Sequence, residues 1–243
     1  MGMPITIEII DRNIEEDIME HVFDYFRSID KRFSPYKKNS ELSKINRGLN
    51  SKKWSKEMRE VLDLCQETSE LSNGYFNITK FGYIDPSGLV KGWSILNASK
   101  LLNNANAHNF YIEAGGDIQV NGDFNDSTSG WQIGIRNPFN TGEVVKIIRL
   151  KDKGIATSGT YIRGSHIYNP LNEYSEIKEI ASLSIIGPNV YEADRFATAA
   201  FAMGSEAINY IEQLEEFEGY MIDNNGIATL TSGFDSYLEI NNA

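Results

Sequence analysis

Short runs of β-forming residues follow one another irregularly in the second half of the chain, and this order most limits the fold. The pattern predicts strands at 109–113, 117–121, 131–136, 145–150, 154–157 and 181–186. Helices are expected at 193–203 and 205–215, and strands again at 218–223, 227–231 and 237–240. Because strands and helices do not alternate regularly, this order favours an α+β fold over a regular βαβ array.

The first half of the chain is richer in helix. Residues 5–10 alternate apolar and polar side chains, which predicts a strand. Apolar residues recur every three or four positions in 13–29 and 55–72, so both are expected to be helices, the first with Asn13 as its N-cap. We expect a loop at 34–46 with a short helix near its end, and a helix over 91–102. With no repeat or linker, residues 1–243 are expected to form one domain.

Composition excludes several classes of function. Acidic residues outnumber basic ones, 34 to 23, and the formal net charge of −11 argues against general binding to nucleic acids or anionic membranes. No apolar run approaches the roughly 20 residues of a membrane span. The N-terminus lacks the pattern of a secretion signal, so we expect a cytoplasmic protein. The one cysteine, Cys65, lies in an apolar helical pattern and is interpreted as a small buried residue.

Two segments near expected helices carry oxygen and nitrogen groups that suit a ligand. Asp194 and Thr198 are four residues apart, which places both side chains on one helical face. Carboxylate and hydroxyl oxygens suit a hard cation such as Mg²⁺, although a capped helix with a buried threonine fits the same residues. Asp85, Gly88 and Lys91 lead into a helix, where a lysine can meet an anion or simply face solvent.

Two turns are further candidates for ligand contacts. Gly115 and Gly116 precede Asp117 directly after an expected strand, and paired glycines let the backbone approach a ligand closely. Ser158 lies in a Thr-Ser-Gly turn that can hold phosphate oxygens, and His166 follows on the next segment. Each motif also fits an ordinary turn, so none of them decides the function when taken singly.

The order of the motifs resembles that of the ApbE-like family, the FAD:protein FMN transferases. The resemblance rests on segments that span nearly the whole chain: "MGMP" (1–4), "SPYKKNSELSKIN" (34–46), "GYFNI" (74–78), "DPSGLVKG" (85–92), "GGDI" (115–118), "ATSGTY" (156–161), "HIYNP" (166–170) and "ADRFAT" (193–198). It implies a single mixed α/β domain that binds FAD with Mg²⁺.

The resemblance also implies a reaction. Members of the family split FAD at its pyrophosphate and transfer FMN to a threonine or serine of a target flavoprotein, releasing AMP; some hydrolyse FAD to FMN and AMP instead. This chain has no D-x-x-[ST]-G-A-[ST] acceptor segment of its own, so the acceptor is expected to be another protein. A flavin-binding protein without turnover is a third possibility.

Position by position, the resemblance implies a role for a set of residues. The metal ligands are the Gly88 carbonyl, Asp194 and Thr198. His166 lies beside the phosphates and is a candidate general base. The residues expected to bind FAD are Met1, Tyr36, Phe76, Asn77, Ile78, Asp85, Lys91 and Ile167.

The chain also departs from the family pattern. Asn77, Asn169 and Ala197 stand where relatives usually carry aspartate, which is expected to weaken Mg²⁺ binding. Only "TKFGYI" (79–84) separates Ile78 from Asp85, where relatives usually have several tens of residues. These departures leave transfer, hydrolysis and binding alone as open alternatives.

Overall fold

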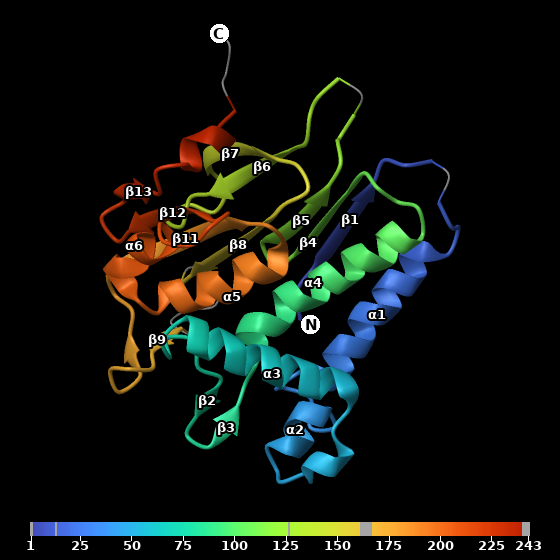
Figure 1. The fold of residues 1–243 in the computed structure, drawn as a ribbon, viewed down its shortest axis with the longest axis vertical. Coiled ribbons are helices and arrows are strands. Elements are labelled where there is room, and N and C mark those ends of the chain that lie inside the picture. The colour runs from blue at the N-terminus through green and yellow to red at the C-terminus, as the bar shows by residue number, and fades with distance from the viewer. Residues whose placement is uncertain (1, 13, 126, 161–166, 240–243) are drawn as a thin grey trace.

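A seven-stranded antiparallel sheet forms the centre of the protein in the computed structural model, which describes residues 2–12, 14–125, 127–160 and 167–239. Its strand order is β1-β4-β5-β8-β11-β12-β13 (Figure 1). The strands are β1 (Ile5–Ile9), β4 (Phe110–Ala114), β5 (Asp117–Asn121), β8 (Gly154–Gly159), β11 (Ile180–Gly187), β12 (Glu218–Asp223) and β13 (Ala228–Leu230). Every neighbouring pair in this sheet is antiparallel, which confirms the α+β fold class.

Helices cover one face of the sheet. They are α1 (Ile18–Phe33), α4 (Ser87–Asn104), α5 (Val190–Phe201) and α6 (Ala207–Ile211), and α4 and α5 lie side by side (Figure 1). On α5, the small residues Ala193, Ala197 and Ala200 are fully buried in one cluster with Leu183 and Ile185 of β11. Because these side chains are short, the helix axis approaches the sheet closely.

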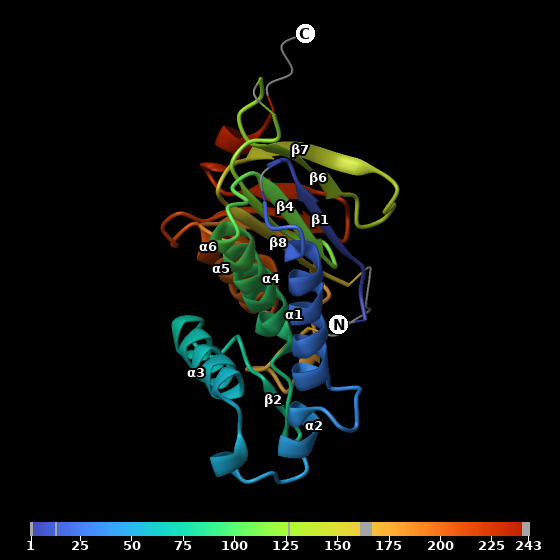
Figure 2. The same ribbon diagram turned by 90° about the vertical axis from the view of Figure 1, so that its right-hand side faces the viewer.

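The opposite face is covered by a hairpin of β6 (Trp131–Arg136) and β7 (Val144–Leu150) (Figure 2). The apolar side of β6 alternates with exposed residues, as expected for a half-buried strand. Its residues Trp131, Ile133 and Ile135 pack in one cluster with Ile118 and Ile155 of the central sheet. The domain therefore has three layers, with the central sheet between the hairpin and the helices.

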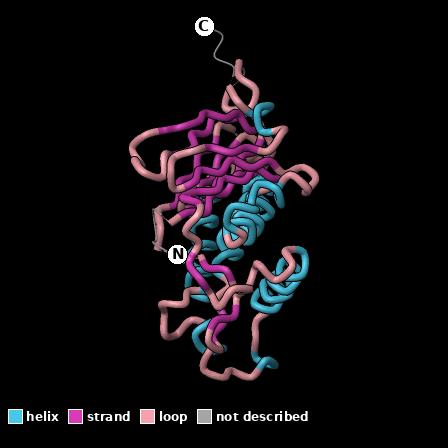
Figure 3. Tube along the Cα trace, turned by 90° about the vertical axis from the view of Figure 1, so that its left-hand side faces the viewer, coloured by secondary structure: helices cyan, strands magenta, loops and turns pink. Residues whose placement is uncertain are grey.

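A smaller group of elements lies beyond the helical layer, and Figure 3 shows α3 set apart from the sheet. It contains α2 (Glu41–Ile45), the 3₁₀ turn Ser51–Lys53, α3 (Lys56–Leu71) and the short hairpin of β2 (Thr79–Lys80) and β3 (Tyr83–Ile84). The N-cap side chain of Ser55 accepts a hydrogen bond from the Met58 amide, which starts α3 where the sequence predicts it. A second short hairpin, β9 (Tyr168–Asn169) with β10 (Ser175–Glu176), follows the gap at 161–166.

Some expected boundaries are wrong. The helix expected at 13–29 begins at Ile18 and continues to Phe33, with Asp17 as N-cap; Asn13 is outside the described residues. The helix expected at 91–102 begins at Ser87, whose amide donates to Asp85 Oδ1 at 3.0 Å and so gains an acceptor in the first turn.

The C-terminal part also differs from expectation. The helix expected at 205–215 is a 3₁₀ turn (Gly204–Glu206) followed by the short α6. The strand expected at 237–240 does not form within the described residues, which end at 239. Tyr237 is the last residue of a 3₁₀ turn (Phe234–Tyr237), and Leu238 forms an isolated bridge with Ile148. The turn buries Phe234 completely against the sheet, which removes its apolar surface from water. Among the described residues, no helix combines the length and the apolar character needed to cross a membrane.

Candidate functional site

The site is built where α4 and α5 cross. Gly88 and Gly92 lie one turn apart on α4, and they face Thr198 and Asp194, one turn apart on α5. The Gly92 amide donates to Asp194 Oδ2 at 2.7 Å, and Thr198 Oγ1 donates to the Gly88 carbonyl at 3.1 Å. A Cβ at Gly88 would lie 2.9 Å from Thr198 Cγ2, so glycine is needed for this close approach.

Lys91 is held between two carboxyl groups at this crossing. Its Nζ forms an ion pair with Asp117 Oδ2 and lies 3.5 Å from Asp194 Oδ1. Asp117 starts β5 and is fully buried, and its Oδ1 accepts the Thr157 amide at 3.2 Å. Burial raises the pKa of Asp117 above its ordinary value, while the charge of Lys91 opposes the rise and Asp194 adds to it. The two carboxyl groups fix the lysine ammonium in one place.

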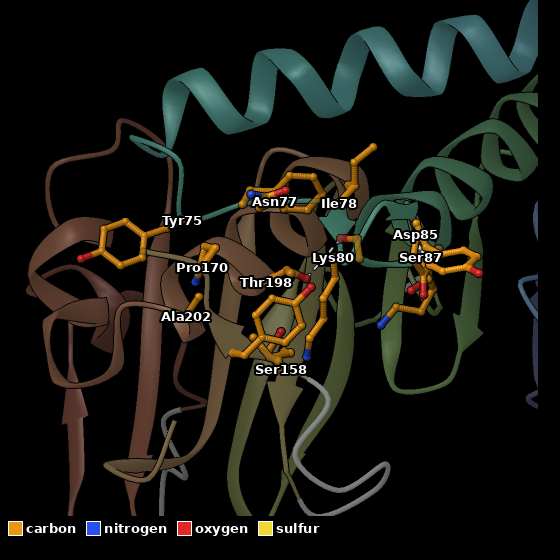
Figure 4. A pocket seen from close by; sticks show the side chains of 16 residues that line it. Tyr75, Asn77, Ile78, Lys80, Asp85, Ser87, Ser158, Pro170, Thr198 and Ala202 are labelled. Carbon is orange, nitrogen blue, oxygen red and sulfur yellow. Dashed lines mark hydrogen bonds between the residues drawn. The ribbon is translucent and has the colours of Figure 1, made fainter. Parts of the chain in front are cut away.

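A cavity of about 350 Å³ opens in front of this crossing (Figure 4). It is lined by Tyr75, Phe76, Asn77, Ile78, Lys80, Tyr83, Asp85, Ser87, Gly88, Lys91, Ser158, Ile167, Tyr168, Pro170, Thr198 and Ala202. These residues come from the segment after α3, the β2–β3 hairpin, the start of α4, the end of β8, the start of the β9–β10 hairpin, and α5. A volume of this size is typical of small-molecule sites.

The structure brings most of the predicted site residues together. The cavity lining includes the predicted residues Phe76, Asn77, Ile78, Asp85, Gly88, Lys91, Ile167 and Thr198. Asp194 is only 3% exposed and lies directly behind the lining, in contact with Gly92 and Lys91. Tyr36 does not line the cavity and its residue surface is 94% exposed. Met1 and His166 are outside the described residues.

Sequence reasoning missed several cavity residues. The lining also contains Tyr75, Lys80, Tyr83, Ser87, Tyr168, Pro170 and Ala202, to which the sequence assigned no role. The sequence marks Asp117 only as the end of a glycine turn, although it pairs with Lys91. The sequence signal that could have found these residues is the high density of glycine and aromatic residues in 74–95. This density indicates a ligand site only when the structure shows that the β2–β3 hairpin contributes to the cavity lining.

The three positions at which the sequence departs from the family pattern that it resembles differ in their surroundings. Asn77 lines the cavity, and its Oδ1 accepts the Thr79 amide at 2.8 Å. Asn169 Oδ1 accepts the Leu171 amide at 2.9 Å and stabilises the β9–β10 turn. Ala197 is fully buried in the apolar cluster between α5 and the sheet. Position 197 therefore belongs to the core and not to the cavity wall.

The donor atoms fit a magnesium ion by their chemistry. The Gly88 carbonyl, the Thr198 hydroxyl and the Asp194 carboxylate are hard oxygen donors brought together by one helix crossing. Within the described ranges, no group of three or more His, Cys, Asp or Glu side chains could hold a metal ion. A metal at this crossing would therefore also need the carbonyl and hydroxyl oxygens as ligands. Mg²⁺ commonly binds through one or two carboxylates together with water and substrate phosphates, which suits a site with a single carboxylate ligand.

Comparison with known proteins gives a consistent match. Residues 1–82 and 80–221 match the sequence model of the ApbE family. The chain is 29% identical over 192 residues to the FAD:protein FMN transferase of Haemophilus influenzae, covering 74% of this chain and 54% of that protein. It is 31% identical over 133 residues to the transferase of the same name from Vibrio cholerae, covering 51% and 40%. The chain thus spans about half the length of these relatives.

Solved structures show the same fold. The flavin transferase ApbE from Vibrio cholerae superposes with a TM-score of 0.84 at 22% identity, covering 98% of this chain and 96% of that one. The ApbE protein from Thermotoga maritima gives a TM-score of 0.85 at 22% identity, with the same coverage. At this level of identity the likeness concerns the fold alone.

Proposed function

The chain belongs to the ApbE family, and from this we propose that it is a Mg²⁺-dependent FAD:protein FMN transferase. It cleaves FAD at the pyrophosphate, attaches FMN to a threonine or serine hydroxyl of another flavoprotein, and releases AMP. The acceptor carries a segment of the form D-x-x-[ST]-G-A-[ST]. The observation that carries the proposal is the helix crossing at the cavity. There Gly88, Lys91 and Thr198 line the cavity, and Asp194 lies directly behind them.

The proposed reaction is an in-line displacement at phosphorus. The acceptor hydroxyl oxygen forms a bond to the phosphorus on the FMN side as the pyrophosphate P–O bond breaks. AMP leaves with the bridging oxygen, and the hydroxyl proton passes to a base, for which we propose His166. When bound by Gly88, Asp194 and Thr198, Mg²⁺ supplies Lewis-acid stabilisation of the phosphate oxygens.

Lys91 stabilises the charge that develops on the phosphates in this proposal. Lys91 lines the cavity, and its ammonium is held by Asp117 and Asp194, so it needs little reorganisation when the substrate arrives. Asp194 has a second role here, because it also accepts the Gly92 amide and so couples the ligand position to the helix crossing. Asp117 acts on the substrate only through Lys91.

The walls of the cavity suit the remaining parts of FAD. Phe76 is almost fully buried, and Asn77 and Ile78 continue the wall beside it. We propose that this segment lies along the flavin nucleotide, since aromatic and apolar surfaces pack against a flat ring system. Asp85 lines the cavity at the start of α4 and is proposed to hold FAD by accepting a hydrogen bond.

Product analysis tests the proposal. The pure protein is incubated with FAD, Mg²⁺ and a flavoprotein domain that carries the acceptor segment, and intact mass, AMP and free FMN are followed. We expect the acceptor to gain the mass of FMN as AMP appears, and an acceptor whose target threonine is replaced by valine to gain none.

The other outcomes separate the alternatives. AMP and free FMN without labelling of the acceptor would make the protein an FAD pyrophosphatase. FAD that binds and stays intact would leave only a flavin-binding protein. Asp194→Ala is the matched variant, because it removes the carboxylate proposed as a metal ligand. Equal turnover in this variant and the wild type would remove Asp194 from the metal site.

A further inference from the structure

The β2–β3 hairpin brings a second lysine to the cavity. Thr79 and Lys80 pair with Ile84 and Tyr83 across a two-residue turn. Phe81 in this turn has a φ of 51°, so a bulky residue adopts a left-handed conformation that it seldom takes. Lys80 lines the cavity, and in Figure 4 its side chain runs from the hairpin toward Ser158. The short link between the flavin segment and α4 is therefore part of the site.

An aromatic cluster holds the Lys80 ammonium. Its Nζ lies 3.8 Å from the ring centroid of Tyr168, and 5.6 Å and 5.7 Å from those of Phe81 and Tyr174. The rings also contact one another, with centroids 5.1 Å apart for Tyr168 and Tyr174 and 5.7 Å apart for Phe81 and Tyr174. Tyr174 Oη also donates to the Thr79 carbonyl at 3.4 Å, so the β2–β3 and β9–β10 hairpins hold each other in place.

The two cavity lysines differ in how their charge is balanced. Lys91 is engaged by the carboxyl groups of Asp117 and Asp194. Among the ion pairs of the described residues, none includes Lys80. An aromatic face attracts an ammonium without neutralising its charge. The rings therefore fix the position of Lys80 and leave its positive charge available to an anion in the cavity.

We propose that Lys80 binds a phosphate of the dinucleotide substrate, with Tyr168, Phe81 and Tyr174 as the residues that position it. This inference rests on the proposed function, because it takes a dinucleotide as the occupant of the cavity. The pyrophosphate brings negative charge into a cavity whose lining contains Asp85, and whose other lysine is shared with two carboxyl groups. A charge-assisted contact at Lys80 meets that need.

Binding of FAD, measured by flavin fluorescence without added metal or acceptor, tests the inference apart from turnover. The dissociation constant is determined at two salt concentrations for the wild type, Lys80→Gln and Lys80→Arg. Lys53→Gln is the matched control, because it removes the same charge at an exposed position that does not line the cavity. Thermal unfolding of each variant shows whether the fold is retained.

We expect Lys80→Gln to weaken FAD binding about tenfold and to reduce its salt dependence, since a charge-assisted contact is lost. Lys80→Arg should restore most of the affinity, and Lys53→Gln should match the wild type. Wild-type affinity in Lys80→Gln would overturn the inference and leave the proposed function standing. Weaker binding with an unchanged salt dependence would also overturn the inference, because Lys80 would then only hold the two hairpins together and would not contact a phosphate. A wild-type protein that binds FAD neither in this assay nor with Mg²⁺ added would overturn the proposed function as well.

Discussion

Replacing Gly92 by alanine tests the helix crossing on which the site depends. An ideal Cβ at this position would lie 2.6 Å from Asp194 Cβ, 2.7 Å from the Val190 carbonyl oxygen and 3.0 Å from Tyr191 Cα. Backbone atoms of α5 cannot move aside as a flexible side chain can. The new methyl group must therefore push α4 and α5 apart.

The magnitude follows from three effects. Overpacking of a close contact costs about 1–3 kcal/mol. Moving the helices apart also weakens the hydrogen bond from the Gly92 amide to Asp194, now 2.7 Å, and such bonds to a charged group contribute about 1.5–3 kcal/mol. Alanine gains about 1 kcal/mol over glycine in a helix interior. We expect a net loss of about 1.5–5 kcal/mol in the free energy of unfolding.

Urea unfolding followed by circular dichroism measures this loss. For a domain of this size, a loss near 3 kcal/mol lowers Tm by about 6–12 °C. The matched control is Gly142→Ala, because Gly142 is exposed and its nearest neighbour, Asn140 Oδ1, would be 3.6 Å from the added carbon. The control should stay within about 0.5 kcal/mol of the wild type. A Gly92→Ala protein as stable as the control would refute the close contact of α4 and α5.

Three further predictions concern single side chains. Asp194→Asn keeps an acceptor for the Gly92 amide but removes the charge, so we expect FMN transfer to fall about 100-fold with a smaller loss of stability than in Asp194→Ala; equal transfer rates would contradict this. Burial raises the pKa of the Cys65 thiol to about 12, and Asp85 adds to the rise, so a thiol reagent at neutral pH should label the native protein far more slowly than the unfolded one. Burial works to raise the pKa of Asp11, but hydrogen bonds from Asn109 and His108 outweigh it and hold that pKa below its ordinary value. The ionised Asp11 carboxylate therefore stabilises the fold above about pH 4, and this contribution is lost as the pH falls through the lower folded-state pKa. When the pH is lowered from about 5 to about 2, the free energy of unfolding of Asp11→Asn should fall less than that of the wild type.

Local sequence patterns predicted the elements of this fold well. Most strands of the central sheet begin and end within a few residues of expectation, because alternation along a strand and helical spacing depend on near neighbours in the chain. The errors lie at boundaries and in the C-terminal region. There Phe234 enters the core from a 3₁₀ turn that no local pattern marks, and the gain from its burial depends on distant strands.

The candidate site was predicted in part. The one-turn spacing of Asp194 and Thr198 is a local property, and the sequence by itself placed both side chains on one helical face. It also placed Lys91 at the start of a helix and Gly88 in the segment that leads into it. The order of these motifs along the chain pointed to the ApbE family, which the match over residues 1–82 and 80–221 establishes.

Only the tertiary structure decided which of these residues meet. The Gly92 amide and Asp194 are 102 positions apart in the chain, yet they share a hydrogen bond because two glycines let α4 and α5 cross in contact. Likewise, Lys80 lies over the ring of Tyr168, from a hairpin far along the chain. Contacts of this kind depend on how helices cross and hairpins dock. Neighbouring residues fix the face of a helix, but they carry no information on what that face will meet.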